Sequence, residues 1–547
     1  MDSKIYELWK QIYGTENDAV FTELTDLLEK SKKDFTPSIE LKEDWYKDAV
    51  LYSAYVDLFA GDFLGFVKRL PYLQELGVDT LWLLPMLESP MRDQGFDISD
   101  YTKVRHDLGG NQQFFDFLEK AHSYGIKIIF DMALNHTSDQ HPWFQDAKQS
   151  KDAKYRDFYI WNNNTEKYED ARLLFKGMVN SNWEYNTATD DFYFHRFYEF
   201  QPDLNYRNPR VFLEMAKACV FWKLKGVDGL RMDAIPFIWK EQGTNCENLP
   251  TTHLIIKLFR ECLDYVGKGT LLMAEANMEP KDVVEYFGNG DECHTAYHFP
   301  LMPRIFLSLA ESDRKYIIRT LSPQVTPDKP EECQWMSFLR CHDELTLEFV
   351  TKEERDLMNS HYLHNPRLTF REGEGIAGRL YDLMKKDVRK VLTMYSMLMT
   401  VIGTPIIYYG DEVAAENDEK FFSASAEQTG YPDARFFNRG PMQWHKGEIA
   451  EKDPTSDEAK VHDGLKAMIE KRREYCELFR VDPSYPLIGD DDVLYIRREK
   501  DGTVLTCVHN LSEDQKKVEV RGKELFSEER FESLKMTPYS YAWIIEE

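Results

Sequence analysis

The sequence predicts an α/β protein: a (β/α)8 barrel with an inserted subdomain after the third strand and a C-terminal antiparallel β-domain. Short apolar runs alternate with helical segments eight times through the centre of the chain, as in a barrel of parallel strands. One connection, of roughly 75 residues, is too long for a loop. Near the C-terminus, helical segments give way to short strands separated by tight turns. A doubly wound sheet would produce the same alternation, so that alternative stays open on the count alone.

Composition and periodicity divide the chain into four predicted parts. Residues 1–43 form a helical N-terminal extension, because apolar side chains recur in it at helical spacing. The barrel follows over residues 44–484, and a connection rich in Asp, Asn, Tyr and Trp forms an inserted subdomain over 136–208. Residues 485–547 form a small C-terminal β-domain of sandwich type. Its predicted strands cover residues 493–498, 503–510, 517–521 and 540–545.

Each predicted barrel strand is a short apolar run bounded by polar or turn-forming residues. The most apolar stretch, residues 394–409, is interrupted by Gly and Pro and is too short to cross a bilayer. We expect it to be a buried helix that leads into the last strand. The eight strands cover residues 49–56, 80–85, 126–133, 226–233, 270–276, 296–300, 334–340 and 405–410. The helical segments between them include residues 64–76, 111–124, 211–224 and 252–265.

The chain carries 68 basic and 95 acidic side chains, a formal net charge of −27 at pH 7. A field of this sign repels phosphates and anionic lipid, so we expect neither nucleic acid nor a membrane as a partner. Neutral substrates remain compatible with it. The eight cysteines include no Cys-x-x-Cys pair, and the first residues, MDSKIYELWKQIYG, lack the features of a secretion signal. These observations predict a cytoplasmic protein with reduced thiols.

Charged residues stand at the predicted strand ends, where the active sites of (β/α)8 barrels lie. On the fourth strand, alternation places Arg231 and Asp233 on one face of an otherwise apolar run. A buried charge is costly unless it is paired, so these residues form either a structural ion pair or part of a functional site. Glu275 ends the apolar run of the fifth strand, a setting that raises a carboxyl pKa. A solvated loop position is the alternative for Glu275.

His342 and Asp343 follow the seventh strand, and His136 follows the third. Each of them alone is compatible with a local hydrogen-bonded turn or another structural role. Together, carboxylates, histidines and an arginine from separate strands meet on one rim of the predicted barrel. Cleavage of a glycosidic bond requires two carboxyl groups, one ionised to attack the anomeric carbon and one protonated to release the leaving oxygen.

Several stretches resemble the motifs of glycoside hydrolase family 13, the α-amylase family, in order along the chain. The resemblance covers roughly residues 44–412. The motif stretches are residues 80–85, 131–136, 201–205 (Gln-Pro-Asp-Leu-Asn), 229–233 (Gly-Leu-Arg-Met-Asp), 274–277 and 338–343. The stretch 201–205 resembles the oligo-1,6-glucosidase branch, and residues 241–250, 290–294, 298–303 and 342–348 resemble the trehalose synthases within it.

The resemblance implies a role for each matching residue. Asp233 would be the nucleophile and Glu275 the acid/base, while Asp343 would orient the hydroxyls of a glucosyl unit. Arg231 would hold Asp233 ionised. The other substrate-binding residues that the resemblance implies are Asp97, Phe96, His136, His342 and Gln201.

Some positions depart from the family pattern. Phe96 replaces a tyrosine, and Cys341 replaces an asparagine before the His-Asp pair. Residues 375–380, Gly-Ile-Ala-Gly-Arg-Leu, lack two of the three arginines of a segment that closes over substrate in trehalose synthases. Arg371 and Arg379 are the candidates to compensate. Because transfer inside the pocket requires the exclusion of water, these changes bear on the balance between isomerisation and hydrolysis.

The resemblance also implies calcium sites. The loop over residues 56–62 is shorter than the calcium-binding loop of relatives, so we expect no ion there. A second site in trehalose synthases uses the positions of Asn135 and Asp203, nearby carbonyls, and a glutamate that is Lys240 here. An ammonium group can replace the charge of the ion, so we expect no metal and no cofactor.

We therefore expect a retaining enzyme that acts on α-glucosidic bonds of short, neutral saccharides through a covalent glucosyl–Asp233 intermediate. Maltose–trehalose interconversion is the expected reaction, and α-glucosidase hydrolysis of small α-glucosides is the alternative. A non-catalytic sugar-binding or scaffold protein of the same fold is a remote alternative, because such proteins usually lack one of the carboxylates. The sequence is compatible with an oligomer.

Overall fold

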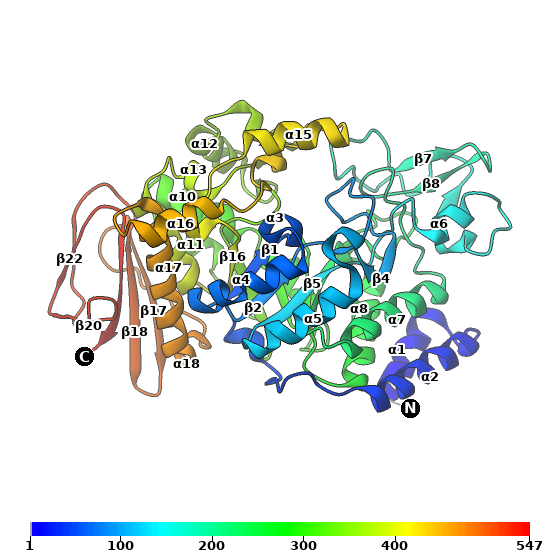
Figure 1. Ribbon diagram of the computed structural model, residues 1–547, viewed down its shortest axis with the longest axis horizontal. Helices are drawn as coiled ribbons and strands as arrows, with labels where there is room; N and C mark the ends of the chain where they lie inside the picture. Colours follow the sequence, from blue (N-terminus) through cyan, green and yellow to red (C-terminus); the bar gives the residue numbers. More distant parts are fainter. Residues whose placement is uncertain (1–2) are drawn as a thin grey trace.

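Eight parallel strands close into a barrel at the centre of the computed structural model, which describes residues 3–547 (Figure 1). Each strand lies beside its neighbours in chain order, and the last closes on the first through the pairing of Leu51 with Ile406. Every predicted barrel strand overlaps one of them, although β11 and β16 each begin one residue before the predicted range, so the predicted fold class is confirmed. The barrel strands are β1 (Leu51–Ala54), β2 (Thr80–Leu83), β5 (Lys127–Ala133), β9 (Gly229–Asp233), β10 (Leu271–Ala274), β11 (Thr295–Tyr297), β12 (Gln334–Phe338) and β16 (Thr404–Tyr408).

Helices cover the outside of the barrel and begin at caps that the sequence supplies. The Asp62 carboxylate accepts a 2.7 Å hydrogen bond from the backbone N–H of Gly65 at the start of α4. Asn208 caps α7, whose first residue is Pro209. The predicted buried helix and last strand are α14 and β16. The long outer helices are α4 (Phe63–Leu76), α5 (Gly110–Ser123), α7 (Pro209–Leu224), α8 (Pro250–Val266), α10 (Leu301–Ala310), α14 (Val388–Thr400) and α17 (Asp457–Glu474).

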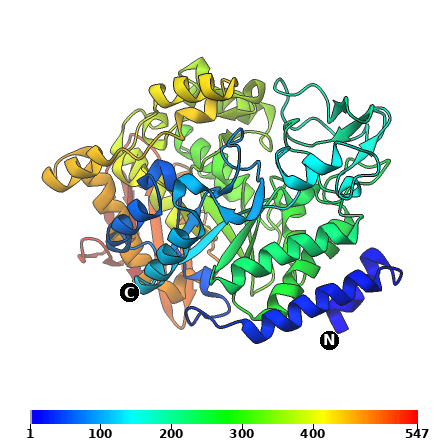
Figure 2. The same cartoon turned by 45° about the vertical axis from the view of Figure 1, so that its right-hand side comes forward.

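Two helices precede the barrel, α1 (Ser3–Tyr13) and α2 (Asp18–Asp34), and they lie against α7 and α8 (Figure 2). The Trp9 ring packs 5.5 Å from the Phe21 ring and 6.2 Å from the Phe212 ring on α7. Burial of these large rings joins the N-terminal helices to the wall of the barrel.

A small antiparallel sheet, in the order β6-β8-β7, occupies the long connection after β5. A second set of short elements follows β12 and includes the sheet β13-β15-β14. Both sets contribute walls to the cavity described below. Their elements are α6 (Pro142–Ala147), β6 (Trp161–Asn162), β7 (Trp183–Asn186), β8 (Asp191–Phe194), β13 (Leu345–Thr346), α12 (Lys352–Tyr362), β14 (Thr369–Phe370) and β15 (Gly375–Ile376).

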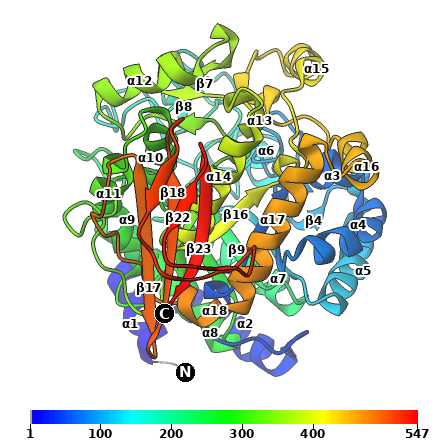
Figure 3. The same ribbon diagram turned by 90° about the vertical axis from the view of Figure 1, so that its left-hand side faces the viewer.

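The C-terminal segment forms a five-stranded antiparallel sheet, β17-β18-β23-β20-β21, beside the barrel helices (Figure 3). Arg498 donates to the backbone carbonyls of Thr400 and Val401, and Trp543 Nε1 donates to Ser396 Oγ at 2.9 Å. The strands are β17 (Val493–Lys500), β18 (Thr503–Asn510), β19 (Lys516–Val518), β20 (Gly522–Glu524), β21 (Arg530–Phe531), β22 (Leu534–Met536) and β23 (Ser540–Glu546).

The prediction of one strand over residues 517–521 is wrong. The chain leaves the two-stranded sheet β19-β22 after Val518 and joins the larger sheet at Gly522. At Gly522 the backbone passes so close to β23 that an added Cβ would lie 2.1 Å from the Ile545 carbonyl oxygen. A side chain has no room here, so the glycine permits the close approach with which β20 joins the larger sheet, while β19 pairs only with β22.

One hydrophobic core runs from the N-terminal helices through the barrel into the C-terminal sheet, with Trp9 and Trp543 among its buried side chains. This core crosses the predicted domain boundaries near residues 43 and 484, and the C-terminal β-domain holds a second, smaller core that includes Val493 and Val508. The boundaries stay predictions. Within residues 3–547, the structure contains no helix with the length and apolar character that a bilayer crossing requires.

Candidate active site

A cavity opens at the carboxyl ends of the barrel strands. Asp233 is the last residue of β9, Glu275 directly follows β10, and Asp343 lies in the loop after β12. Of the nine site residues predicted from the sequence, eight line this cavity. They are Phe96, His136, Gln201, Arg231, Asp233, Glu275, His342 and Asp343.

The predicted ion pair between Arg231 and Asp233 is present inside this cavity. Arg231 Nη1 donates to Asp233 Oδ1 and also to Asp131 Oδ1 on β5, at 2.7 Å. Trp82 Nε1 donates to the other Asp131 oxygen at 2.9 Å. Burial raises the pKa of Asp233, and the guanidinium of Arg231 opposes that rise. Arg231 therefore favours the ionised form of the Asp233 carboxyl group.

Glu275 lies beside this pair but, within residues 3–547, forms no ion pair. The backbone N–H of Ala234 donates to Glu275 Oε2 at 2.9 Å. Ala234 has a φ of 56°, a left-handed turn directly after the nucleophile candidate, and that turn directs its N–H toward Glu275. Burial raises the pKa of Glu275 to about 7. Glu275 can therefore hold a proton near neutral pH while Asp233 remains paired with a cation.

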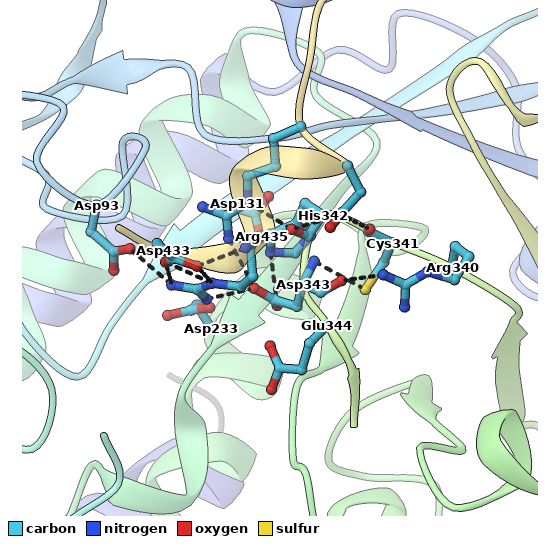
Figure 4. A network of polar contacts seen from close by, with 12 residues as sticks. Asp93, Asp131, Asp233, Arg340, Cys341, His342, Asp343, Glu344, Asp433 and Arg435 are labelled. Atoms are coloured by element: carbon cyan, nitrogen blue, oxygen red, sulfur yellow. Dashed lines mark hydrogen bonds and ion pairs between the residues drawn. The ribbon is translucent and has the colours of Figure 1, made fainter. Parts of the chain in front are cut away.

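Asp343 is surrounded by hydrogen-bond donors (Figure 4). Arg435 Nη1 lies 2.9 Å and Arg439 Nη2 3.0 Å from Asp343 Oδ1, and His342 Nε2 lies 3.1 Å from Oδ2. Burial alone would raise the pKa of Asp343, but these contacts hold it well below its usual range. Burial lowers the pKa of His342 to about 4, so its imidazole is neutral. Asp343 therefore presents a fixed negative charge to the cavity.

Phe96, His136 and Gln201 give the cavity an aromatic and polar wall. The Phe96 ring stacks on the His342 ring at 5.3 Å. His136 Nε2 is buried without a hydrogen-bond partner in the described part of the chain. Gln201 Nε2 donates to Asp93 Oδ2 at 3.0 Å. A flat ring and unsatisfied polar atoms together suit a neutral, hydroxyl-rich ligand.

Asp97 does not line the cavity, and its predicted contact with substrate is therefore wrong. Its buried carboxylate accepts hydrogen bonds from Ser89 Oγ at 2.9 Å and from the backbone N–H groups of Arg92 and Asp93, both at 3.2 Å. The loop turns back at Gln94, where φ is 49°, so Asp97 points into the loop and Asp93 faces the cavity instead.

Charged side chains from the inserted segment and from the loops after β12 close one side of the cavity. Arg172 contacts Glu348, and its Nε lies 3.0 Å from Glu247 Oε1. Arg371 Nη1 lies 3.1 Å from Glu348 Oε2, and Asn277 Nδ2 donates to the same oxygen at 3.1 Å. Glu348 is therefore the centre of a network that joins the inserted segment to the loops opposite it.

Arg371, and not Arg379, stands beside the cavity. Arg379 is buried elsewhere and donates to the backbone carbonyl of Tyr409. Arg371 and Glu372 both have positive φ values, 47° and 55°, in the turn between β14 and β15. This strained turn brings the Arg371 guanidinium to Glu348.

The residues that match a calcium site in relatives surround an ammonium group. Lys240 Nζ lies 2.7 Å from Asn135 Oδ1 and 2.7 Å from Asp203 Oδ2, and all three side chains are buried. Calcium needs six to eight oxygen ligands at about 2.3–2.6 Å, and the ammonium fills the space between these two oxygens. The residues present therefore do not fit a calcium ion.

Comparison with known proteins places this site in a family. Residues 28–457 match the model of the alpha amylase catalytic domain. The chain belongs to the alpha-amylase family. A solved structure of a trehalulose synthase mutant in complex with Tris shares the fold, with a TM-score of 0.73 and 22% identity over 92% of this chain and 99% of that chain.

Curated relatives of this alpha-amylase family member carry related names. This chain is 44% identical over 394 residues to the trehalose synthase/amylase of Mycobacterium tuberculosis, and the aligned region covers 70% of this chain and 65% of that protein. It is also 44% identical over 413 residues to the trehalose synthase of Thermus thermophilus, and this region covers 74% of this chain and 41% of that protein. An oligo-1,6-glucosidase of Bacillus cereus is 31% identical over 395 residues, covering 69% and 67%. The match therefore spans less than two thirds of the first two relatives.

Several cavity residues were missed in the sequence. Asn277 and Glu348 lie inside stretches that carry the family resemblance, and this position could have indicated that they line the cavity. Asp93 lies three residues before Phe96 but follows no predicted strand. Glu247 also lies in a stretch that carries the resemblance, residues 241–250, and Arg371 was already a candidate from the sequence. Arg172 and Arg435 lie in loops or short turns with no periodicity, and only the fold brings them to the barrel rim.

Proposed function

We propose that this protein is a retaining enzyme for α-glucosidic bonds of short, neutral saccharides, and that its main reaction is the interconversion of maltose and trehalose. The observation that carries the proposal is the contrast between two neighbouring carboxyl groups. Asp233 forms an ion pair with Arg231, whereas Glu275 forms no ion pair within residues 3–547 and burial raises its pKa to about 7. One ionised and one protonated carboxyl group is the requirement for double displacement at an anomeric carbon.

In the first step, Glu275 donates its proton to the glycosidic oxygen while the Asp233 carboxylate attacks the anomeric carbon. The bond to the leaving glucose breaks, and a β-glucosyl ester of Asp233 forms. Asp343 and His136 face the glucosyl unit from the cavity wall. The fixed charge of Asp343 can hydrogen-bond to sugar hydroxyls and stabilise positive charge that develops on the ring in the transition state.

In the second step, the ionised Glu275 takes a proton from the acceptor hydroxyl, and the acceptor oxygen attacks the anomeric carbon as the bond to Asp233 breaks. When the acceptor is the anomeric hydroxyl of the retained glucose, the product is trehalose. When it is water, the product is glucose. The Glu348 network on one side of the cavity supports the first outcome, because it restricts the exchange of glucose for water.

Hydrolysis of small α-glucosides is the second candidate function. The chain lacks two arginines of the segment that closes over substrate in trehalose synthases. Of the two candidates to replace them, Arg371 lies beside the cavity and Arg379 does not. A cavity that closes less completely would admit more water to the same intermediate. A non-catalytic role is disfavoured because Asp233, Glu275 and Asp343 all line the cavity.

The proposed reaction uses no metal and no cofactor, because every step is carried by side chains. The position of Lys240 between Asn135 and Asp203 supports the absence of calcium from that site. All eight cysteines are free thiols, which supports a reducing compartment such as the cytoplasm. The proposed partners are small, neutral saccharides, and an oligomer remains compatible with the sequence.

Proton NMR of the protein with maltose, followed over time, tests the proposal. We expect a growing trehalose signal with glucose as a minor product. Glucose alone, appearing first as the α-anomer, would replace the proposed interconversion by retaining hydrolysis. Glucose released first as the β-anomer, or no reaction with maltose, trehalose, sucrose and isomaltose, would contradict the retaining mechanism or the enzymatic function.

A further inference from the structure

We propose that Lys240 is a built-in cation that does the structural work of a bound calcium ion, and that glutamate at this position would convert the site into a calcium site. The claim about calcium is independent of the proposed function. The claim that Lys240 also positions His136 for the sugar rests on it.

The Lys240 ammonium joins three segments that are distant in the sequence. Asn135 follows β5, Asp203 belongs to the long inserted segment, and Lys240 follows β9. The backbone links between the first two are already present: Leu204 N donates to the Asn135 carbonyl at 2.9 Å, and His136 and Asp203 form an isolated antiparallel bridge. These links form a crossing of the two segments. The ammonium adds the positive charge that this crossing needs, because the Asp203 carboxylate is 0% exposed.

Charge and ligand chemistry predict what a glutamate would do here. With lysine, the buried site holds one negative charge, on Asp203, and one positive charge, so it is neutral. With glutamate, it would hold two carboxylates and the amide oxygen of Asn135. Two negative charges balance one dication, and carboxylate and amide oxygens are the ligands that calcium prefers. Without an ion, two buried carboxylates would repel each other and loosen the crossing.

The crossing lies directly behind the cavity. Asn135 precedes His136, and Asn135 Nδ2 lies 3.4 Å from His136 Nδ1. The opposite ring nitrogen, Nε2, is buried and has no hydrogen-bond partner among the described residues, and His136 lines the cavity. Lys240 holds Asn135 from one side, so it fixes the backbone and ring of His136 without touching substrate. It is a positioning residue.

Thermal unfolding with EGTA or with 1 mM calcium tests the calcium claim. We expect the wild-type melting temperature to be the same under both conditions. Lys240→Glu should melt at a lower temperature in EGTA and gain roughly 5 °C in calcium, with one ion bound per chain by isothermal calorimetry. Steady-state kinetics should show a maltose KM for Lys240→Glu that is about tenfold higher in EGTA than in calcium.

Lys223→Glu is the matched control. Lys223 is also buried, but its Nζ lies 2.5 Å from Thr270 Oγ1 and forms no ion pair among residues 3–547. A glutamate there lacks a second carboxylate for an ion, so calcium should not change its melting temperature. Calcium rescue limited to position 240 would show an ion site, since a general stabilisation by calcium would affect both variants.

Three results would overturn the inference. EGTA could lower the melting temperature of the wild-type protein, or a folded Lys240→Glu could fail to respond to calcium. If Lys240→Glu does not fold, Lys240→Gln decides: a wild-type melting temperature for this neutral variant would show that the charge is not needed. If the wild-type protein is inactive on every α-glucoside while Lys240→Glu still binds calcium, only the proposed function and the claim about His136 fail.

Discussion

Arg435 Nη1 lies 2.9 Å from Asp343 Oδ1, and Nη2 of the same guanidinium lies 3.8 Å from Asp93 Oδ1 (Figure 4). One arginine therefore joins two carboxylates that line the cavity. Its pair with Asp433, at 2.6 Å, fixes the fork from the other side. Contact with three carboxylates in these directions requires several nitrogen atoms in one plane, and a lysine side chain has only one nitrogen.

Arg435→Lys should lower kcat/KM for maltose by about 100-fold, because Asp343 would lose its fixed orientation in the transition state. Most of the loss should be in kcat, measured by steady-state kinetics. Arg480→Lys is the control: Arg480 also binds two aspartates, Asp44 and Asp48, but it lies outside the cavity. Equal losses in both variants would mean that arginine replacement harms the fold in general.

Asp233→Asn should abolish turnover, with a loss of at least about 10⁴-fold in kcat, because the amide cannot form the glucosyl ester. The side chain keeps its size, so the circular dichroism spectrum should stay that of the wild-type protein. Mass spectrometry of wild-type protein quenched during turnover should detect a glucosyl adduct on Asp233. Retained turnover by Asp233→Asn would rule out its role as nucleophile.

Activity should decline on the alkaline side with a midpoint near pH 7. Glu275 donates a proton in the first step, and burial raises its pKa to about 7. Its protonated fraction is high below this pH and lost above it, so kcat/KM for maltose should fall about tenfold per pH unit above the midpoint. In Glu275→Gln, a glucoside with an activated leaving group, such as 4-nitrophenyl α-glucoside, should show no such alkaline decline. A flat wild-type profile from pH 6 to pH 9 would contradict this assignment.

Glu348→Gln should raise the ratio of glucose to trehalose formed from maltose by about tenfold. The substitution removes the charge that holds Arg172 and Arg371 together at the cavity, and a hydrogen bond to a charged group contributes about 1.5–3 kcal/mol. Glu353→Gln, at an exposed position on α12, serves as the control for a change of charge alone. A product ratio unchanged by Glu348→Gln would show that this network does not determine whether glucose or water is the acceptor.

The sequence alone was sufficient for the barrel and for most of the site because both depend on local patterns. Glu275 directly follows an apolar strand, and Arg231 and Asp233 alternate on one. Asp97 was assigned to the cavity by the family resemblance, but a left-handed turn at Gln94 decides which aspartate faces inward, and a match of residue types carries no information about that turn. Arg371 and Arg435 reach the site from loops, so their contacts depend on the tertiary fold.

The pairing of Leu51 with Ile406 closes the barrel, and it joins residues 355 positions apart. During synthesis, β1 can pair with β2 almost at once, but its other edge must wait for β16. At about 5–20 residues per second, that wait lasts roughly 20 to 70 s. An open strand edge of this kind can pair with other chains. The nascent protein thus carries an aggregation-prone edge through most of its translation, and its yield in a cell should depend on chaperones that act before the ribosome releases it.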